Sequence, residues 1–134
     1  MNLPFRRFGR TNLKIPVLSL GGMRFQQSWN HLDSSEITLK QRNKVDNLLN
    51  LANKYGFNHI ETALHYGTSE LELGFAISNF CRESIILQTK IPPNENVKTF
   101  TENLENSFNN LKVAKIDLVA IHGLNNEDHL FQSI

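Results

Sequence analysis

The chain has 134 residues, 40% of them hydrophobic, and a formal net charge of +1, which is enough apolar sequence for one modest core. The interspersed charges argue against a nucleic-acid surface or a polybasic membrane anchor, and no apolar run reaches the roughly 18 residues of a membrane-spanning helix. A single cysteine, Cys81, excludes an internal disulfide. Together with a start that lacks a signal peptide, it predicts a cytoplasmic protein.

The N-terminal part of the chain predicts a β-hairpin followed by a buried strand. Residues 5–16 are divided by a turn-forming sequence at 9–12 (GRTN), which is typical of a short hairpin. The apolar residues 17–20 then end at Gly21 and Gly22. This pattern indicates a buried strand with a tight exit.

An apolar face predicts the first helix. Apolar side chains recur at i, i+3, i+4 and i+7 between residues 45 and 52, as they do on one buried helix face. Ser34 or Ser35 can cap a helix that begins near Glu36. Gly56 stands where glycine is favoured after a helix C-terminus.

A second strand and a second helix follow. Residues 57–62, which follow Gly56 and contain Phe57 and Ile60, predict a strand. Ser69 and Glu72 match a capping box, which predicts that a helix starts there. Apolar residues between 73 and 80 give that helix its buried face.

The remaining sequence predicts two more strands and one more helix. A strand over residues 84–89 ends at Lys90, because the Pro-Pro pair at 92–93 forces a break. The third helix is expected over 100–111 and a fourth strand over 116–121, before a loop and the first turn of a helix.

This alternation predicts the fold class. Strands that are apolar almost throughout, separated by helices, are typical of an α/β fold with a parallel sheet. No linker divides residues 1–134, so the chain is interpreted as a single domain or as part of one.

Polar residues stand at the ends of the predicted strands. Glu61 ends the second strand, and Tyr66 lies in the loop after it. Lys90 ends the third strand and His122 follows the fourth. Because ligands of parallel α/β folds bind at the carboxyl ends of strands, we expect these side chains to converge.

The types of these residues point to carbonyl reduction. A tyrosine becomes a useful proton donor when a lysine ammonium stabilises its phenolate. A carboxylate can hold that lysine, and a histidine can orient a carbonyl, which completes a general acid. No side chain supplies a hydride, so a cofactor is required. Each residue alone also has an ordinary structural reading, and only their joint placement favours catalysis.

These motifs resemble the N-terminal half of the aldo-keto reductase family. FRRFGRTNLKIPVLSLGGM is similar to the family's opening hairpin and first strand, and HIETALHYGTSE resembles its second-strand signature. LQTK resembles its lysine motif and IDLVAIHG its histidine motif. The resemblance implies a (β/α)8 TIM barrel in which hydride passes between NADPH (NADP) and a small-molecule carbonyl or alcohol substrate.

The resemblance also implies a role for each matching residue. Tyr66 would donate the proton, Lys90 would stabilise its phenolate, and His122 would orient the carbonyl. Gly22 and Met23 would lie against the cofactor near the nicotinamide. No residue is implied as a metal ligand.

Glu61 departs from the aspartate that is usual in the family. Glutamate keeps the charge but is one methylene longer, so its contact with Lys90 must be rearranged. Some members carry the same HIET variant, including a group with a C-terminal ferredoxin-like iron–sulfur extension. We therefore interpret Glu61 as the mark of a subgroup.

The length predicts half of such a barrel. A full barrel needs about 250 residues and eight strands, so we expect a partial domain, truncated after the fourth strand and inactive alone. Its open sheet edges would favour self-association. The alternative is a non-catalytic half-barrel that binds itself or another protein as an interaction module. A complete small dinucleotide-binding domain is disfavoured, because the glycine pair at 21–22 does not form a GxGxxG fingerprint.

Overall fold

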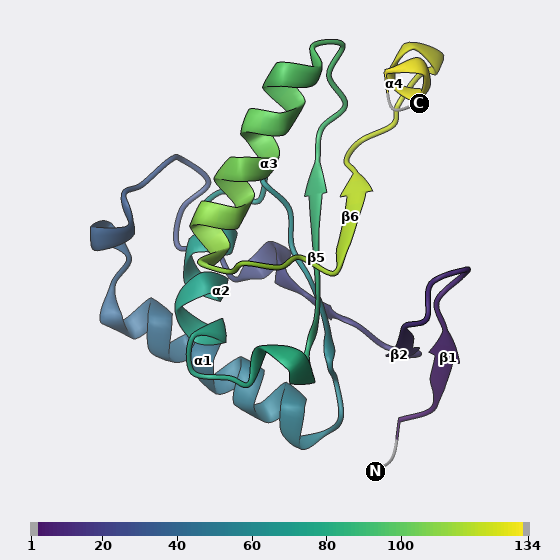
Figure 1. The fold of residues 1–134 in the computed structure, drawn as a ribbon. Coiled ribbons are helices and arrows are strands. Elements are labelled where there is room, and N and C mark those ends of the chain that lie inside the picture. The colour runs from purple at the N-terminus through teal and green to yellow at the C-terminus, as the bar shows by residue number, and fades with distance from the viewer. Residues whose placement is uncertain (1–2, 133–134) are drawn as a thin grey trace.

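The computed structural model describes residues 3–132, which form a four-stranded parallel sheet with helices along one face (Figure 1). The sheet has the order β3-β4-β5-β6, with strands Leu20–Gly21, His59–Glu61, Ile86–Ile91 and Leu118–Ile121. The connecting helices are α1 (Leu39–Lys54), α2 (Ser69–Ile77) and α3 (Val97–Leu111), and a short α4 (Glu127–Phe131) follows β6. The predicted order of strands and helices is confirmed, as is the parallel pairing.

The N-terminal hairpin forms as predicted, but the strand after it is shorter than expected. β1 (Phe5–Arg7) pairs antiparallel with β2 (Lys14–Pro16). The N–H of Val17 then donates to the carbonyl of Pro4 at 3.0 Å, which continues the hairpin for one more residue. The expected strand over 17–20 is therefore wrong, because only Leu20 and Gly21 pair with β4.

The start of α1 also differs from the prediction, whereas its end agrees. Thr38 caps the helix, and its side chain accepts a hydrogen bond from the N–H of Gln41. Ser34 and Ser35 belong instead to a separate 3₁₀ turn that Asp33 caps. Gly56 follows the helix with φ +82°, the left-handed conformation that the sequence predicted.

Helix α2 begins at Ser69 as predicted, but without the expected capping box. The hydroxyl of Ser69 donates to the carbonyl of Gly22 at 2.8 Å and lies 2.9 Å from the hydroxyl of Thr62. Glu72 accepts hydrogen bonds from the N–H of Gln27 and the hydroxyl of Thr68, rather than from the main-chain N–H that a capping box requires. Tertiary bonds have replaced the local cap, because both side chains are fully buried.

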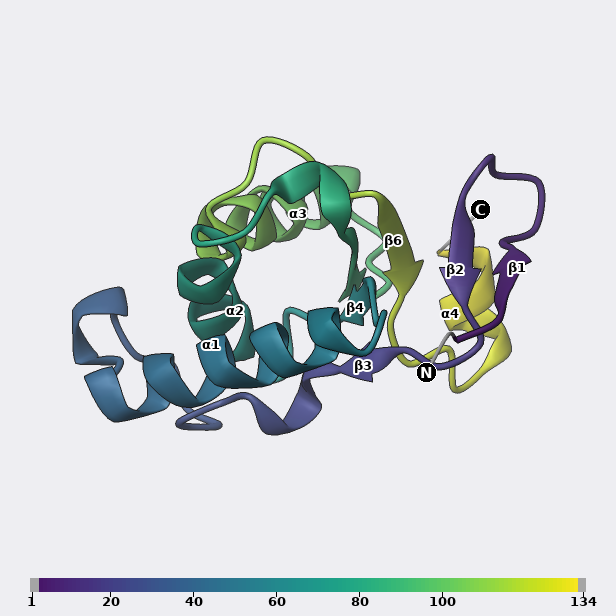
Figure 2. The same cartoon turned by 90° about the horizontal axis from the view of Figure 1, so that it is seen from below.

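The two faces of the sheet differ in chemistry. Side chains of β5 alternate, so that Leu87, Thr89 and Ile91 are buried while Gln88 and Lys90 are partly exposed on the other face. Figure 2 shows α1, α2 and α3 together on one side of the strands, with the hairpin on the other. The core between sheet and helices contains the side chains Val45, Leu49, Ile60, Leu73, Ala76, Leu87 and Leu111.

Within residues 3–132, no helix combines the length and the apolar character needed to cross a lipid bilayer.

Helices α2 and α3 approach each other closely at Gly74. A Cβ atom at this position would lie 2.4 Å from the carbonyl oxygen of Asn110 and 2.9 Å from the carbonyl carbon of Leu111. Both are main-chain atoms near the end of α3, which cannot move aside as a flexible side chain could. The absence of a side chain at Gly74 therefore sets the distance between the two helices.

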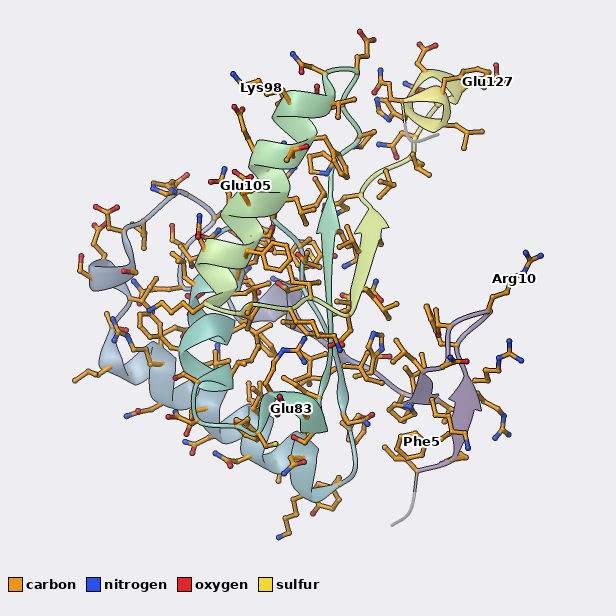
Figure 3. The ribbon with its side chains drawn as sticks, viewed as in Figure 1. Phe5, Arg10, Glu83, Lys98, Glu105 and Glu127 are labelled. Carbon is orange, nitrogen blue, oxygen red and sulfur yellow. The ribbon has the colours of Figure 1, made fainter. Side chains whose placement is uncertain are left out.

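We expect Gly74→Ala to lower the free energy of unfolding by about 1–3 kcal/mol through this overpacking. In a helix without such a contact, replacing glycine by alanine would raise the free energy of unfolding by up to about 1 kcal/mol. The sign of the measured change therefore tells whether the contact with α3 exists. Urea unfolding followed by circular dichroism measures it. Glu105→Ala on the outward face of α3 is the control (Figure 3) and should change stability by less than about 0.5 kcal/mol. A Gly74→Ala chain as stable as the parent would contradict the close contact.

Candidate active site

The ammonium group of Lys90 brings two of the other predicted residues together. It forms an ion pair with Oε2 of Glu61 and donates to the hydroxyl of Tyr66 at 3.1 Å. It also donates to the carbonyl oxygen of Thr62 at 3.2 Å. An ammonium group has three N–H donors, so every donor of Lys90 has a protein acceptor.

The parallel register of β4 and β5 places the ion pair. Glu61 lies opposite Gln88, and Lys90 is two residues farther along β5 on the same face. The side chain of Glu61 is 25% exposed and that of Lys90 is 17% exposed, so solvent screens this ion pair less than it would a pair on the surface. The carboxylate therefore holds the ammonium at the carboxyl end of the sheet.

A tight turn after β4 carries Tyr66. The N–H of Tyr66 donates to the carbonyl of Ala63 at 3.0 Å, and the N–H of Ser69 donates to the carbonyl of Tyr66 at 3.1 Å. Gly67 follows with φ +56°, and a Cβ there would lie only 2.1 Å from the carbonyl oxygen of Ser28. Glycine is thus required at this position twice over, by its conformation and by the chain packed against it.

His122 faces the same tyrosine from β6. The main-chain N–H of His122 donates to the carbonyl of Ile91 at 2.8 Å. The ring of His122 contacts the ring of Tyr66 edge-on, with centroids 5.4 Å apart. Burial lowers the pKa of His122, and the charges of Lys90 and His65 lower it further. A neutral imidazole can still donate one N–H bond to a ligand oxygen.

The two residues expected to contact a cofactor have different surroundings. Gly22 is buried, and a Cβ there would lie 2.8 Å from the carbonyl oxygen of Glu61. Met23 is 43% exposed and open to a ligand. Gly21, which sequence reasoning did not single out, faces the carboxylate: its Cβ would lie 3.8 Å from Oε1 of Glu61. Cofactor binding by Gly22 and Met23 stays a prediction.

Sequence reasoning missed two further features of the cluster. The carbonyl of Thr62 is a main-chain acceptor, and its residue type gives no signal for it. The place of His65 beside Tyr66 suggested only that it lines a pocket entrance and did not predict its contact with His122, whose ring centroid is 6.2 Å away. His65 also lines a pocket of about 500 Å³ together with Trp29. Only its place next to Tyr66 could have suggested a role.

A second polar group lies deeper on the same face of the sheet. Nδ1 of His59 is 2.7 Å from the hydroxyl of Ser19, and its Nε2 is 3.2 Å from Oε1 of Gln88. His59 is 5% exposed, and burial lowers its pKa. His59 is thus a buried residue that joins β4 to β5 and to the chain before β3.

The parallel sheet and the residues at its carboxyl end define part of a TIM-type barrel. The model of the aldo/keto reductase family matches residues 17–131, and the chain belongs to this family. The resemblance inferred from the four sequence motifs is thereby confirmed.

Solved structures show the same fold. The chain is similar to the thermostable aldo-keto reductase Tm1743, solved with the inhibitor epalrestat, with 28% identity, a TM-score of 0.79 and coverage of 98% of this chain and 48% of that one. The putative aldo-keto reductase PA4992 of Pseudomonas aeruginosa gives 28% identity, a TM-score of 0.78 and coverage of 94% and 50%.

A third similar structure is the aldo/keto reductase of Klebsiella pneumoniae, solved with NADP and acetate, at 23% identity and a TM-score of 0.63, with coverage of 81% and 35%. This last likeness concerns the fold alone. The chain spans about half the length, or less, of these structures. It has no match among curated proteins.

We expect Lys90→Met to raise the pKa of His122. The substitution removes a nearby positive charge and frees the carboxylate of Glu61, which favours the imidazolium. Titration of the histidine ring by NMR measures the change.

Lys98→Met provides the control, because Lys98 is an exposed residue at the start of α3 whose partner is Glu102 (Figure 3). It should leave the pKa of His122 unchanged. An unaltered pKa in the Lys90→Met chain would contradict the electrostatic coupling.

Proposed function

We propose that this chain is the N-terminal half of an NADP(H)-dependent aldo-keto reductase and supplies the proton-donating part of its active site. The observation that carries the proposal is the position of Lys90, whose ammonium contacts both the Tyr66 hydroxyl and the Glu61 carboxylate. In this proposal residues 1–134 are a partial domain, and carbonyl reduction needs the rest of the barrel.

Tyr66 is the proposed proton donor. When its proton moves to a substrate carbonyl oxygen, the phenolate that remains is stabilised by the ammonium 3.1 Å away. Glu61 compensates the charge of Lys90 and keeps it aimed at the phenol. Such a general acid contributes roughly 10²–10⁴-fold to the rate of a reaction.

His122 is the proposed orienting residue. Its ring contacts the Tyr66 ring edge-on, which supports a shared role for the two side chains at the carboxyl end of the sheet. A neutral imidazole N–H can bind the carbonyl oxygen without competing for the proton. The substrate class that fits is a small molecule with a carbonyl group or the corresponding alcohol.

The residues at this edge fit a nicotinamide cofactor. Met23 is exposed there, Gly21 leaves space beside Glu61, and the hydroxyl of Tyr66 lies in the same partly exposed cluster. Met23 and the main chain of Gly22 would hold the nicotinamide end, and NADPH supplies the hydride when it is bound. Membership of the aldo/keto reductase family supports this choice of cofactor.

A second candidate is a non-catalytic half-barrel that associates with itself. Within residues 3–132, β3 and β6 have no further neighbour in the sheet, and Val119 of β6 is 44% exposed. An open edge with apolar side chains favours strand pairing between copies. Sedimentation velocity tests it, and a discrete dimer that does not bind NADPH would favour this second function.

We expect NADPH to bind the purified chain saturably and to quench the fluorescence of Trp29, its single tryptophan. Met23→Glu should weaken binding at least tenfold, because it places a negative charge where the cofactor would lie. Leu51→Glu is the matched control, an equally exposed apolar position on α1, and should leave the affinity within twofold. A folded chain that does not bind NADPH would overturn the proposed cofactor site.

A further inference from the structure

A buried carboxyl group outside the Lys90 cluster contacts the chain that covers the Tyr66 turn. Glu72 of α2 is fully buried. Its Oε1 accepts the N–H of Gln27 at 2.5 Å and the hydroxyl of Thr68 at 2.9 Å. These bonds connect the first turns of α2 to residues 27–29, here called the covering segment.

The covering segment lies directly on the turn that carries Tyr66. The N–H of Thr68 donates to the carbonyl of Ser28 at 2.9 Å, and the N–H of Ser28 donates to the Thr68 hydroxyl at 3.2 Å. A Cβ on Gly67 would lie 2.8 Å from the Cα of Trp29. Main chain therefore packs on main chain, with Thr68 bonded to both Glu72 and the segment.

The two oxygens of Glu72 differ in their surroundings. Oε2 is buried and has no hydrogen-bond partner in the part of the chain that the structure describes. Burial raises the pKa of Glu72, since an uncompensated charge there would be costly. The bonded oxygen, Oε1, serves the covering segment and Thr68.

Glu70 shows what a purely architectural carboxylate looks like on the same helix. It is equally buried, at 1% exposure, but both of its oxygens are bonded. Oε1 accepts the hydroxyl of Thr89 on β5 at 2.6 Å, and Oε2 accepts the amide of Asn110 on α3 at 3.1 Å. Glu70 joins the sheet to the helices and makes no bond to the covering segment.

The other attachment of the covering segment is exposed. The side chain of Gln27 accepts the N–H of Thr38 at 2.8 Å and donates to the carbonyl of Glu36 at 3.0 Å. Water competes for exposed bonds of this kind, so the buried bonds to Glu72 and Thr68 are the more specific restraint.

We propose that Glu72 is a positioning residue that holds the covering segment on the Tyr66 turn. By doing so it fixes Trp29, which lines a pocket of about 500 Å³ together with His65 and Leu71. Glu72 thereby sets the width of a pocket beside the Lys90 cluster. The inference concerns the free chain and holds whether or not NADPH binds.

Amide hydrogen exchange of the free chain tests this role. Glu72→Leu removes one acceptor of the Gln27 N–H and the partner that holds the Thr68 hydroxyl, which accepts from both Gln27 and Ser28. Exchange at these two N–H groups should therefore accelerate at least tenfold relative to a core amide such as that of Leu87. Glu72→Gln keeps the oxygen acceptor without a charge and should restore the rates to within about threefold. Trp29 fluorescence should become more accessible to acrylamide in the Leu variant alone.

Glu70→Leu is the matched control, because it removes an equally buried carboxyl group from the same helix. It should lower stability without a selective change at Gln27 and Ser28. If Glu72→Leu does not fold, Glu72→Met, whose unbranched side chain is closer in shape to glutamate, removes the same acceptor and should give the same selective acceleration. Unchanged rates at both amides, or equal acceleration in the Glu70→Leu chain, would overturn the proposal.

Discussion

The geometry of the candidate site depends on the need to satisfy one half-buried cation. The ammonium of Lys90 is largely removed from water and must find fixed acceptors in place of its hydration shell. It finds three, in Glu61 at the end of β4, the carbonyl of Thr62, and the hydroxyl of Tyr66. The register of β4 and β5 places Glu61 and the carbonyl of Thr62 beside the ammonium, and the turn between β4 and α2 places the hydroxyl of Tyr66 there.

One face of the sheet carries the apolar core, and the other carries the polar side chains of the candidate site. Toward the helices, side chains such as Ile60 and Leu87 pack into a continuous apolar core. On the other face, neighbouring strands carry the polar side chains of His59, Gln88 and Lys90. His59 is hydrogen-bonded to Gln88, and Lys90 donates to the hydroxyl of Tyr66. A polar row of this kind is costly unless each group finds a partner, and the short contacts across β4 and β5 supply those partners.

Sequence reasoning succeeded where topology leaves no choice and failed where local and tertiary bonds compete. A parallel sheet brings the carboxyl ends of its strands to one edge, so the convergence of Lys90 with Glu61 and Tyr66 followed from the strand order alone. The capping box at Ser69 matched a local pattern, but a hydroxyl buried between Gly22 and Thr62 forms tertiary bonds instead. Main-chain acceptors were invisible for a related reason, because every residue has a carbonyl and only the fold selects one.

The neighbours of Glu61 in the sheet leave space for its longer side chain. A glutamate extends one methylene farther than an aspartate, and its carboxylate must still reach Lys90 on the neighbouring strand. On its other side Glu61 pairs in register with Gly21 of β3, where a side chain would begin 3.8 Å from Oε1. A residue much larger than glycine or alanine at position 21 would compete with the carboxylate for this space. The identity of residue 61 is therefore coupled to that of residue 21, its neighbour in the sheet. The absence of a side chain at Gly21 leaves space for the longer carboxylate of Glu61.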